Sequence, residues 1–314
     1  MKKLIFNQYG GVDVLQMIEV EKPLIAKNTI LIKTKAVSIN PLDWKIRQGE
    51  MKIMTGSKFP KGLGIDFSGI VEAVGDNVQS YKQGDAVFGA LNAMKGGALA
   101  EYLVVSENDI YLKPNNVSFE QAAAMPIVGS AALQIFDKLI DVKSGSEILI
   151  NGATGGIGMF AVQMAKEKGL IVTAVASEKG FPHLQKWQAD AIIDYKKENI
   201  LDSKMQFDVV IDFSGSISFD KARKLMKPKA VYVNAIPNPA QMITSFIHNL
   251  FSNQKNKILF SKPTPLYLKA LASYAENGME VVIGKTYSFS DFKVAYTEVP
   301  KAGYLGKVVI NIPD

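Results

Sequence analysis

Asn151-Gly-Ala-Thr-Gly-Gly-Ile-Gly158 joins a strand-like run at residues 147–150 to a helix-like run at residues 159–168. Two phosphates can approach the backbone of such a turn, because its glycines carry no Cβ and the helix N-terminus adds partial positive charge. A Gly-rich turn also serves as a plain strand-to-helix connection. Here Gly169 ends the helix and residues 170–176 form a second apolar strand, which completes a βαβ unit. The pattern predicts a dinucleotide-binding turn with contacts from Gly152, Thr154, Gly155, Gly156, Ile157 and Gly158.

The length and composition indicate an ordinary globular protein. The 314 residues are enough for two domains, each with its own core. Hydrophobic residues make up 47% and charged residues 21% of the chain, which is typical of globular proteins. No run of about eighteen apolar residues occurs, and the first few residues are too short to be a signal peptide. We expect a cytoplasmic enzyme with no membrane partner.

The distribution of charge and the absence of cysteine argue against a nucleic-acid interface and against zinc sites with sulfur ligands. The net charge is +6, but lysines and arginines occur along the whole length and form no continuous run. This favours solvated lysines over a nucleic-acid interface. Cysteine is absent, which excludes disulfides and zinc sites with sulfur ligands. The two histidines, His183 and His248, are given no catalytic role.

Short β-like runs separated by Gly, Pro and Asp occupy the chain up to about residue 113. They lie at residues 3–6, 29–33, 67–74, 85–88 and 99–105. Their spacing predicts a compact, barrel-like all-β domain.

The pattern changes after this first part of the chain. Ser118 with Gln121 forms a capping-box signal, and residues 122–140 favour a helix that is interrupted near Pro126 and Gly129. Beyond the Gly-rich turn, apolar strands alternate with helices, and the strands lie at residues 191–195, 207–213, 230–235 and 257–260. The alternation predicts an α/β fold with an open parallel sheet covered on both faces. The β-like end of the chain, residues 307–312, is expected to return to the first domain.

One amphipathic run admits several interpretations. Its apolar residues recur at helical spacing and are Met242, Ile243, Phe246, Ile247, Leu250 and Phe251. Such a face could be a substrate lid, a membrane contact or a subunit interface. Ordinary packing against the sheet is the interpretation we favour.

Several further stretches carry a resemblance to a known family. They are Ala36-Val-Ser-Ile-Asn-Pro-Leu-Asp43, Gly64-Ile-Asp-Phe-Ser-Gly-Ile-Val-Glu-Ala-Val-Gly75, Gly84-Asp85, Gly96-Gly-Ala-Leu-Ala-Glu-Tyr102, Trp187-Gln-Ala-Asp190 and Gly303-Tyr-Leu-Gly-Lys307. Together with the Gly-rich turn, they resemble the medium-chain dehydrogenase/reductase superfamily, in its zinc-independent quinone oxidoreductase branch. The resemblance covers nearly the whole chain. One departure is Gln188, where the family usually has glycine before Ala-Asp.

The resemblance implies both an architecture and the loss of zinc. It implies a GroES-like β-barrel substrate domain at residues 1–117 and 278–314, a doubly wound parallel-sheet Rossmann domain at residues 118–277, and an active site in the cleft. Zinc-containing relatives place a Cys and then a His where this chain has Asn40 and Ile65, and the four-Cys structural zinc loop is missing. Asp66 cannot hold a catalytic zinc alone. We therefore predict no metal.

A metal-free site constrains the reaction. Hydride delivery to a simple ketone creates a localised alkoxide, whereas delivery to a quinone or an enone creates a delocalised, less basic anion. We predict an oxidoreductase that transfers hydride from NADPH to a quinone or an α,β-unsaturated carbonyl. The alternatives are a zinc-free alcohol dehydrogenase and a non-catalytic protein that binds NADPH and contacts RNA.

The candidates for contact with the acceptor lie on one loop. Asn40 could donate its amide N–H to the acceptor's oxygen, or it could be a turn residue before Pro41. Lys45 could act as a proton or hydrogen-bond donor, or it could be a solvated lysine. Asp43 could orient the loop.

Two serines are further candidates for contact with the cofactor. Ser130 lies in a stretch that resembles the family's Gly-Thr-Ala segment near the nicotinamide, although helix capping is an alternative role. Ser214 follows a predicted strand, where the open-sheet rule places ligand contacts, although a plain turn is possible there.

The residues after the second strand bear on the choice of coenzyme. A carboxylate there favours NAD, whereas a hydroxyl and a cation accommodate the 2′-phosphate of NADP. The chain offers Ser177, Glu178 and Lys179. Ser177, Lys179 and Tyr195 match family positions that grip the 2′-phosphate, so we predict NADPH. Glu178 keeps NADH as the alternative.

A second copy of the chain is the expected partner. Residues 257–260 could form an edge strand that pairs across a two-fold axis, as in dimeric relatives. The sequence therefore predicts a homodimer.

Overall fold

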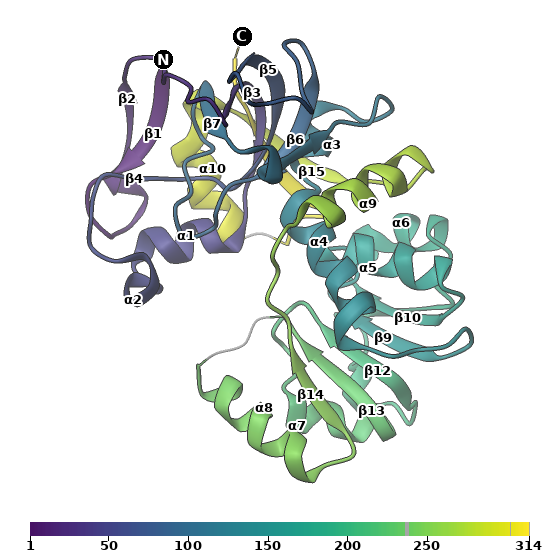
Figure 1. Ribbon diagram of the computed structural model, residues 1–314. Helices are drawn as coiled ribbons and strands as arrows, with labels where there is room; N and C mark the ends of the chain where they lie inside the picture. The colour runs from purple at the N-terminus through teal and green to yellow at the C-terminus, as the bar shows by residue number, and fades with distance from the viewer. Residues whose placement is uncertain (236–238, 302, 314) are drawn as a thin grey trace. The chain divides into compact units, whose positions relative to one another are not determined.

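Figure 1 shows a computed structural model that describes residues 1–235, 239–301 and 303–313, without the side chains of Pro239, Ala240, Met242 and Ile243. The chain forms two units, of which the first is Met1–Ile127 with Pro263–Asp314 and the second is Val128–Lys262. These boundaries differ from the expected ones, since residues 118–127 and 263–277 belong to the first unit. The reason is packing: helix α3 (Phe119–Ala123) contacts strands β3 (Ile30–Ser38) and β5 (Asp66–Val74), and helix α9 (Pro265–Glu276) contacts strand β8 (Ile110–Leu112).

The second unit is built on a six-stranded parallel sheet. Its strand order is β11 (Ala191–Asp194), β10 (Ile171–Ala176), β9 (Glu147–Asn151), β12 (Phe207–Asp212), β13 (Met226–Asn234) and β14 (Lys255–Ile258). The consecutive residues Ile148, Leu149 and Ile150 of β9 are all fully buried, so both faces of this strand are covered. The predicted open parallel sheet is confirmed.

The connections of the second unit are mostly helical. They include α5 (Gly156–Glu167), α6 (Phe181–Lys186), α7 (Phe219–Ala222) and α8 (Pro239–Phe251). Helix α4 (Pro126–Gln134) precedes the sheet and continues into a π-helix at Ile135–Leu139. The capping box predicted at Ser118 is present at the start of α3, where Gln121 N donates to Ser118 Oγ over 3.2 Å. None of the described helices is long and apolar enough to cross a bilayer.

The first unit contains the β-rich part of the chain. Its larger sheet has the order β15 (Ile283–Ser288), β16 (Lys307–Asn311), β3, β5, β6 (Ala86–Ala90) and β8, with β7 (Tyr102–Val105) also paired to β3. A small sheet joins β2 (Leu15–Glu19), β1 (Lys2–Phe6) and β4 (Lys61–Gly62).

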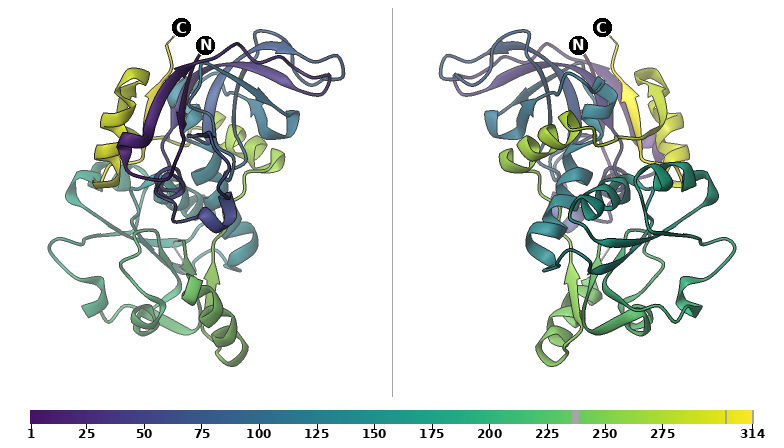
Figure 2. Two further views of the ribbon diagram at one scale, coloured as in Figure 1. Left: turned by 90° about the vertical axis from the view of Figure 1, so that its left-hand side faces the viewer. Right: turned by 90° about the vertical axis from the view of Figure 1, so that its right-hand side faces the viewer.

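Both ends of the chain contribute to this first unit. Strand β16 pairs antiparallel with β3, with Val309 opposite Ser38. Figure 2 shows β16, in yellow, running among the N-terminal strands. The C-terminal strand therefore returns to the first unit, as predicted. It also places Lys307, the first residue of β16, near the start of helix α1 (Pro41–Gln48).

Gln188, the departure from the family pattern, has an unusual backbone. Its φ is +59°, and it is the one non-glycine residue with positive φ among the residues the structure describes. A β-carbon is strained in this left-handed region, which explains why glycine suits the position.

The favoured interpretation of the amphipathic run is wrong for the residues whose side chains are described. Phe246, Ile247, Leu250 and Phe251 of α8 are 69%, 53%, 64% and 86% exposed. Helix α8 turns its polar side inward instead, where Asn249 bonds to the backbone of Asn256. Helical periodicity predicts a face but not the direction in which it points. Met242 and Ile243 lie outside the described side chains.

Candidate active site

The Gly-rich turn connects β9 to α5 in the second unit. Gly152 has φ +79°, and Gly155 is the N-cap of α5. A β-carbon on Gly158 would lie 2.2 Å from the carbonyl oxygen of Gly152, so the first helical turn packs directly on the glycine corner. The first N–H groups of α5 have no acceptor within the helix, and no acidic residue lies in its first turn. These N–H groups, including those of Gly156 and Ile157, can bind an anion.

Close packing ties this turn to the loop that follows β10. Gly152 N and Ala153 N both donate to Val175 O over 3.1 Å. Thr154 is nearly buried, and a β-carbon on Gly180 would lie 2.6 Å from its methyl carbon. The Thr154 side chain therefore packs on the loop, which leaves its backbone as the part that could face a phosphate.

A polar network lies at the adjacent carboxyl ends of β9 and β12. Asn151 Nδ2 donates to Asp212 Oδ1 over 2.9 Å and to Ser214 Oγ over 2.8 Å. Ser214 Oγ also donates to Asp212 Oδ1 over 2.9 Å. The sheet order reverses between β9 and β12, which is the switch point where open α/β sheets bind ligands. The structure thus brings Ser214 to the place expected from the sequence, on a rigid support that sequence reasoning missed.

A surface pocket of about 360 Å³ lies beyond the ends of β10 and β11. It is lined by Ser177, Glu178, Lys179, Asp194, Lys196 and Lys197. The pocket brings together the two residues predicted from the loop after β10 and adds two lysines from the loop after β11. Those lysines were missed because they follow a different strand, although the parallel pairing of Ala176 with Asp194 brings the two strand ends side by side.

The charges in this pocket are partly paired. Lys197 Nζ lies 3.1 Å from Glu178 Oε2 and 3.7 Å from Asp194 Oδ2. The hydrogen bond with the Glu178 carboxylate raises the pKa of Lys197. Tyr195, predicted beside these residues, is 60% exposed, and its N–H donates to Ala176 O over 3.3 Å.

Ser130 lies on α4 in the second unit and is fully buried. Its hydroxyl has no hydrogen-bond partner among the described residues. A buried hydroxyl without a partner costs stability, so a bound group that accepts or donates there would satisfy it. The Gly-rich turn, the lysine-lined pocket and this hydroxyl without a partner together fit a phosphorylated dinucleotide cofactor.

In the first unit, Asn40 lies at the centre of a buried polar cluster. Lys307 Nζ donates to Asn40 Oδ1 over 2.6 Å and to Ile39 O over 2.7 Å. Asn40 Nδ2 donates to Asp66 Oδ2 over 3.1 Å, and Ile127 N donates to Asp66 Oδ1 over 3.2 Å. A lysine has only donors and a carboxylate only acceptors, so the two partners fix which way the Asn40 amide points.

This cluster is a poor fit for a metal ion. The oxygen of Asn40, the one metal-ligating atom of its side chain, faces the Lys307 ammonium instead of an open position. Ile65, at the second position, carries no ligand atom. The part of the chain that the structure describes contains no group of three or more His, Cys, Asp or Glu residues that could hold a metal.

A second carboxylate, Asp43, borders the same cluster from helix α1. Its Oδ2 accepts from Asn40 N over 2.8 Å and from the Tyr296 hydroxyl over 3.4 Å. Burial raises the pKa of Asp43 to about 7 and that of Asp66 to about 6. Burial lowers the pKa of Lys307, against the attraction of both carboxylates. For both acids the effect of burial outweighs the attraction of the Lys307 ammonium, so both hold protons more tightly than usual.

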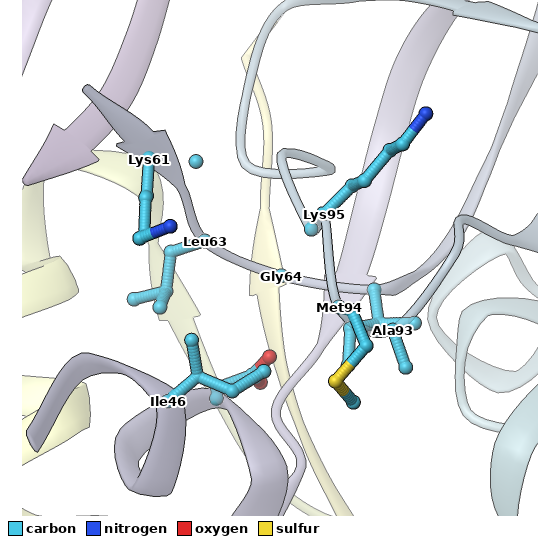
Figure 3. A pocket seen from close by; sticks show the side chains of 11 residues that line it. Ile46, Lys61, Leu63, Gly64, Ala93, Met94 and Lys95 are labelled. Atoms are coloured by element: carbon cyan, nitrogen blue, oxygen red, sulfur yellow. The ribbon is translucent and has the colours of Figure 1, made fainter. Parts of the chain in front are cut away.

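The pocket in Figure 3 opens beside Asp43. Its lining includes Ile46 of α1, the backbone around Gly64, and Met94. The figure shows Lys95 extending away from the cavity, which has a volume of about 10 Å³ and room for about one water molecule. Lys45, the predicted donor, is half-buried on α1 and is not among the residues that line it. The structure thus brings Asn40 and Asp43 together but leaves Lys45 outside their network.

Comparisons with known proteins agree with this geometry. Residues 26–115 match the alcohol dehydrogenase GroES-like domain, and residues 187–310 match the family described as zinc-binding dehydrogenase. The chain is 37% identical to 2-methylene-furan-3-one reductase of Solanum lycopersicum, covering 99% of this chain and 79% of that protein. It is 38% identical to the chloroplastic NADPH-dependent alkenal/one oxidoreductase of Arabidopsis thaliana, over 72% of this chain and 60% of that protein.

A solved structure is also similar over the full length. The quinone oxidoreductase of Coxiella burnetii has 29% sequence identity and a TM-score of 0.88, with 100% of this chain and 99% of that chain covered. The chain therefore belongs to the medium-chain dehydrogenase/reductase superfamily, in its quinone oxidoreductase-like family, and is an NAD(P)H-dependent oxidoreductase.

Proposed function

We propose that this oxidoreductase uses NADPH to reduce quinones and α,β-unsaturated carbonyls without a metal ion. The observation that carries the proposal is the pocket that Lys179, Lys196 and Lys197 line beyond strands β10 and β11. Three ammonium groups against two carboxylates give this pocket a net positive charge, which favours a 2′-phosphate.

The individual roles in coenzyme binding follow from position. Ser177 and Lys179 would hydrogen-bond the 2′-phosphate, and Tyr195 would cover the adenine end with its exposed ring. Glu178 favours NADH, because its carboxylate could accept from ribose hydroxyls. Its pairing with Lys197 opposes that role. The N–H groups of the Gly-rich turn would hold the diphosphate, and Ser130 and Ser214 would contact the nicotinamide half.

The absence of a metal ion is supported by the chemistry of the donor set. Lys307 already presents a cation to Asn40 Oδ1, and a zinc ion beside that ammonium would be repelled. With no cysteine anywhere in the chain, the sulfur ligands of zinc-containing relatives cannot be supplied.

When bound, NADPH would supply the hydride. The protein's part is to bind the acceptor and stabilise the charge that develops on its oxygen. Among the described residues, Asp66 accepts one of the two N–H groups of the Asn40 amide, and the second would serve the acceptor's oxygen. Lys45 would provide a proton or a further hydrogen bond. Quinones and enones suit such a site because their reduced anions are delocalised and need less stabilisation.

We also propose that the chain forms a homodimer through strand β14, which is the last strand of its sheet. An edge strand leaves backbone donors and acceptors that a second copy can pair. Light scattering on the purified protein would give the mass in solution. A monomer at all concentrations would exclude this arrangement.

The test of activity is a panel of acceptors. Purified protein would be mixed with NADPH and with several quinones and enones, and the absorbance of the reduced nicotinamide would be followed. Oxidation of NADPH by at least one conjugated acceptor is expected. Turnover of simple alcohols with NADP⁺ and of no conjugated acceptor would indicate an alcohol dehydrogenase. Tight NADPH binding with no turnover of any kind would indicate a binding protein.

A further inference from the structure

Asp212, the last residue of strand β12, is a buried carboxylate held by neutral donors. It is 2% exposed, and none of its recorded partners in the described part of the chain carries a positive charge. Its Oδ1 accepts from Asn151 Nδ2 over 2.9 Å and from Ser214, whose N and Oγ lie at 3.0 Å and 2.9 Å. Its Oδ2 accepts from Ile217 N over 3.0 Å. Buried carboxylates are costly and usually pair with a cation, so this one calls for an explanation.

The network around Asp212 is joined to the Gly-rich turn. Asn151 precedes Gly152 and lies opposite Asp212 in the parallel pairing of β9 with β12, which are neighbours in Figure 1. Phe213 N donates to Asn151 O over 3.0 Å, and a β-carbon on Gly152 would lie 3.3 Å from Phe213 Cβ. The turn after β9 and the loop at residues 213–216 therefore form one assembly, and a group bound by one of them is placed relative to the other.

The exposed residues Ser214 and Ser216 carry the hydroxyls of this network. Their Oγ atoms lie 2.7 Å apart, and Asn151 Nδ2 can donate to them over 2.8 Å and 2.9 Å. Charge-assisted bonds to Asp212 take one Asn151 hydrogen and the Ser214 hydroxyl hydrogen. The donors that remain are the second Asn151 hydrogen, Ser216 N and the Ser216 hydroxyl. At least one of the four lone pairs on the two serine oxygens is then open to a ligand.

The order of the strands indicates which part of the coenzyme would reach this loop. Strands β11, β10, β9 and β12 are consecutive neighbours in the sheet. The pocket proposed for the 2′-phosphate lies beyond β10 and β11, and the turn proposed for the diphosphate follows β9. The next group along the coenzyme is the second ribose, and the next strand end is that of β12. Ribose hydroxyls both donate and accept, as serine hydroxyls do.

We propose that Asp212 is a positioning residue, which holds the hydroxyls of Ser214 and Ser216 for contact with the ribose on the nicotinamide side of the coenzyme. The inference rests on the proposed function, because it takes NADPH as the ligand. Asp212 is buried and acts through the Asn151 amide and the serine hydroxyls. Ser216 becomes a further binding residue beside Ser214. The alternative is that Asp212 only closes the chain after β12.

The experiment is calorimetric titration with three ligands that differ by one group each. NADPH is the whole coenzyme, 2′-phospho-ADP-ribose lacks the nicotinamide, and 2′-phospho-ADP ends at the second phosphate and so lacks the second ribose as well. Each ligand would be titrated into wild-type protein and into the D212N, S216A and D212N/S216A variants. None of these measurements requires an acceptor or turnover.

The matched controls are D141N and S144A, which make the same chemical changes elsewhere in the second unit. Asp141 and Ser144 are exposed and lie in the loop before β9, at the opposite end of that strand from Asn151. Thermal unfolding would verify that each variant is folded. Ser216 is exposed, so S216A tests the ribose contact even if the buried change D212N destabilises the protein.

For NADPH and 2′-phospho-ADP-ribose, D212N should weaken binding about tenfold or more and S216A about fivefold, since charge-assisted bonds exceed neutral ones. The affinity for 2′-phospho-ADP should stay as in wild type, because this ligand has no second ribose. The double variant should resemble D212N, since Asp212 acts through the hydroxyl that S216A removes. Both controls should bind all three ligands as wild type does.

Three results would overturn the proposal. The first is an unchanged affinity for 2′-phospho-ADP-ribose in D212N or in S216A. The second is an equal loss for all three ligands in D212N, which would make Asp212 a support of the Gly-rich turn. The third is full additivity of D212N and S216A, which would show that Asp212 does not act through Ser216. Wild-type protein that binds none of the ligands would contradict the proposed function and this inference with it, which sets that failure apart from the other three.

Discussion

The lysines beyond β10 and β11 give a sharp prediction about the coenzyme. Replacing Lys179 and Lys197 with glutamine removes two cations from the pocket and keeps the length and polarity of the side chains. The Lys197 and Glu178 side chains are 67% and 72% exposed, so solvent weakens each interaction. A contribution typical of an exposed charge-assisted contact is about fivefold in affinity per lysine, and about twenty-fivefold for the pair if the effects are additive.

The same change should act differently on NADH, which has no 2′-phosphate. Loss of Lys197 frees the Glu178 carboxylate, so the affinity for NADH should stay the same or rise. Glu178→Gln should act in the opposite sense and strengthen NADPH binding. The assay is calorimetric titration of each variant with NADPH and with NADH, which requires no acceptor. K204Q/K221Q, at two exposed lysines outside the pocket, is the control with the same change in charge. Equal losses for the two coenzymes in K179Q/K197Q would refute the assignment of the pocket.

Three further predictions concern single residues. Gly158→Ala should weaken NADPH binding at least tenfold in the same titration, because the new Cβ would lie 2.2 Å from Gly152 O and force the corner open; unchanged affinity would contradict this. Gln188→Gly should raise the free energy of unfolding by up to about 1 kcal/mol in urea denaturation, since it relieves a β-carbon at φ +59°; a loss of stability would show that the Gln188 side chain matters more than its backbone. Asp43→Asn should flatten the pH dependence of the free energy of unfolding. Because the pKa of Asp43 is raised in the folded protein, its contribution to stability is fully present below the unfolded pKa of 3.8 and is lost as the pH rises through about 7. Unfolding midpoints of both proteins at several pH values in that window would check it, and parallel curves would contradict it.

Much of the cofactor side could be predicted from the sequence, because it is built from residues that are close along the chain. The Gly-rich turn lies between its own strand and helix, and periodicity with glycine spacing is enough to recognise it. Ser214 was expected at the end of a strand by a rule of sheet topology alone. Lys196 and Lys197 were not, because their relevance depends on the parallel pairing of β10 with β11.

The polar cluster of the first unit shows what local patterns leave out. Asn40 was recognised, but its partner Lys307 lies 267 residues further along the chain. That lysine was part of the family motif at residues 303–307, and the motif gave no indication that its ammonium is buried against an amide. Only the return of β16 to β3 makes the contact. Tyr296, which donates to Asp43, was missed for the same reason.

Helix α8 was predicted as an element but given the wrong orientation. The spacing of its apolar residues fixes which side chains share a face. Whether that face points inward depends on what the opposite side can bind, here the backbone of β14.

We propose that hydride reaches a conjugated acceptor without help from a metal ion. The most direct measurement is the rate of quinone reduction by NADPH with protein dialysed against a strong chelator, its metal content verified by mass spectrometry. We predict that the metal-depleted protein keeps the full rate and that added zinc does not raise it. A loss of activity on dialysis that zinc restores would contradict this proposal.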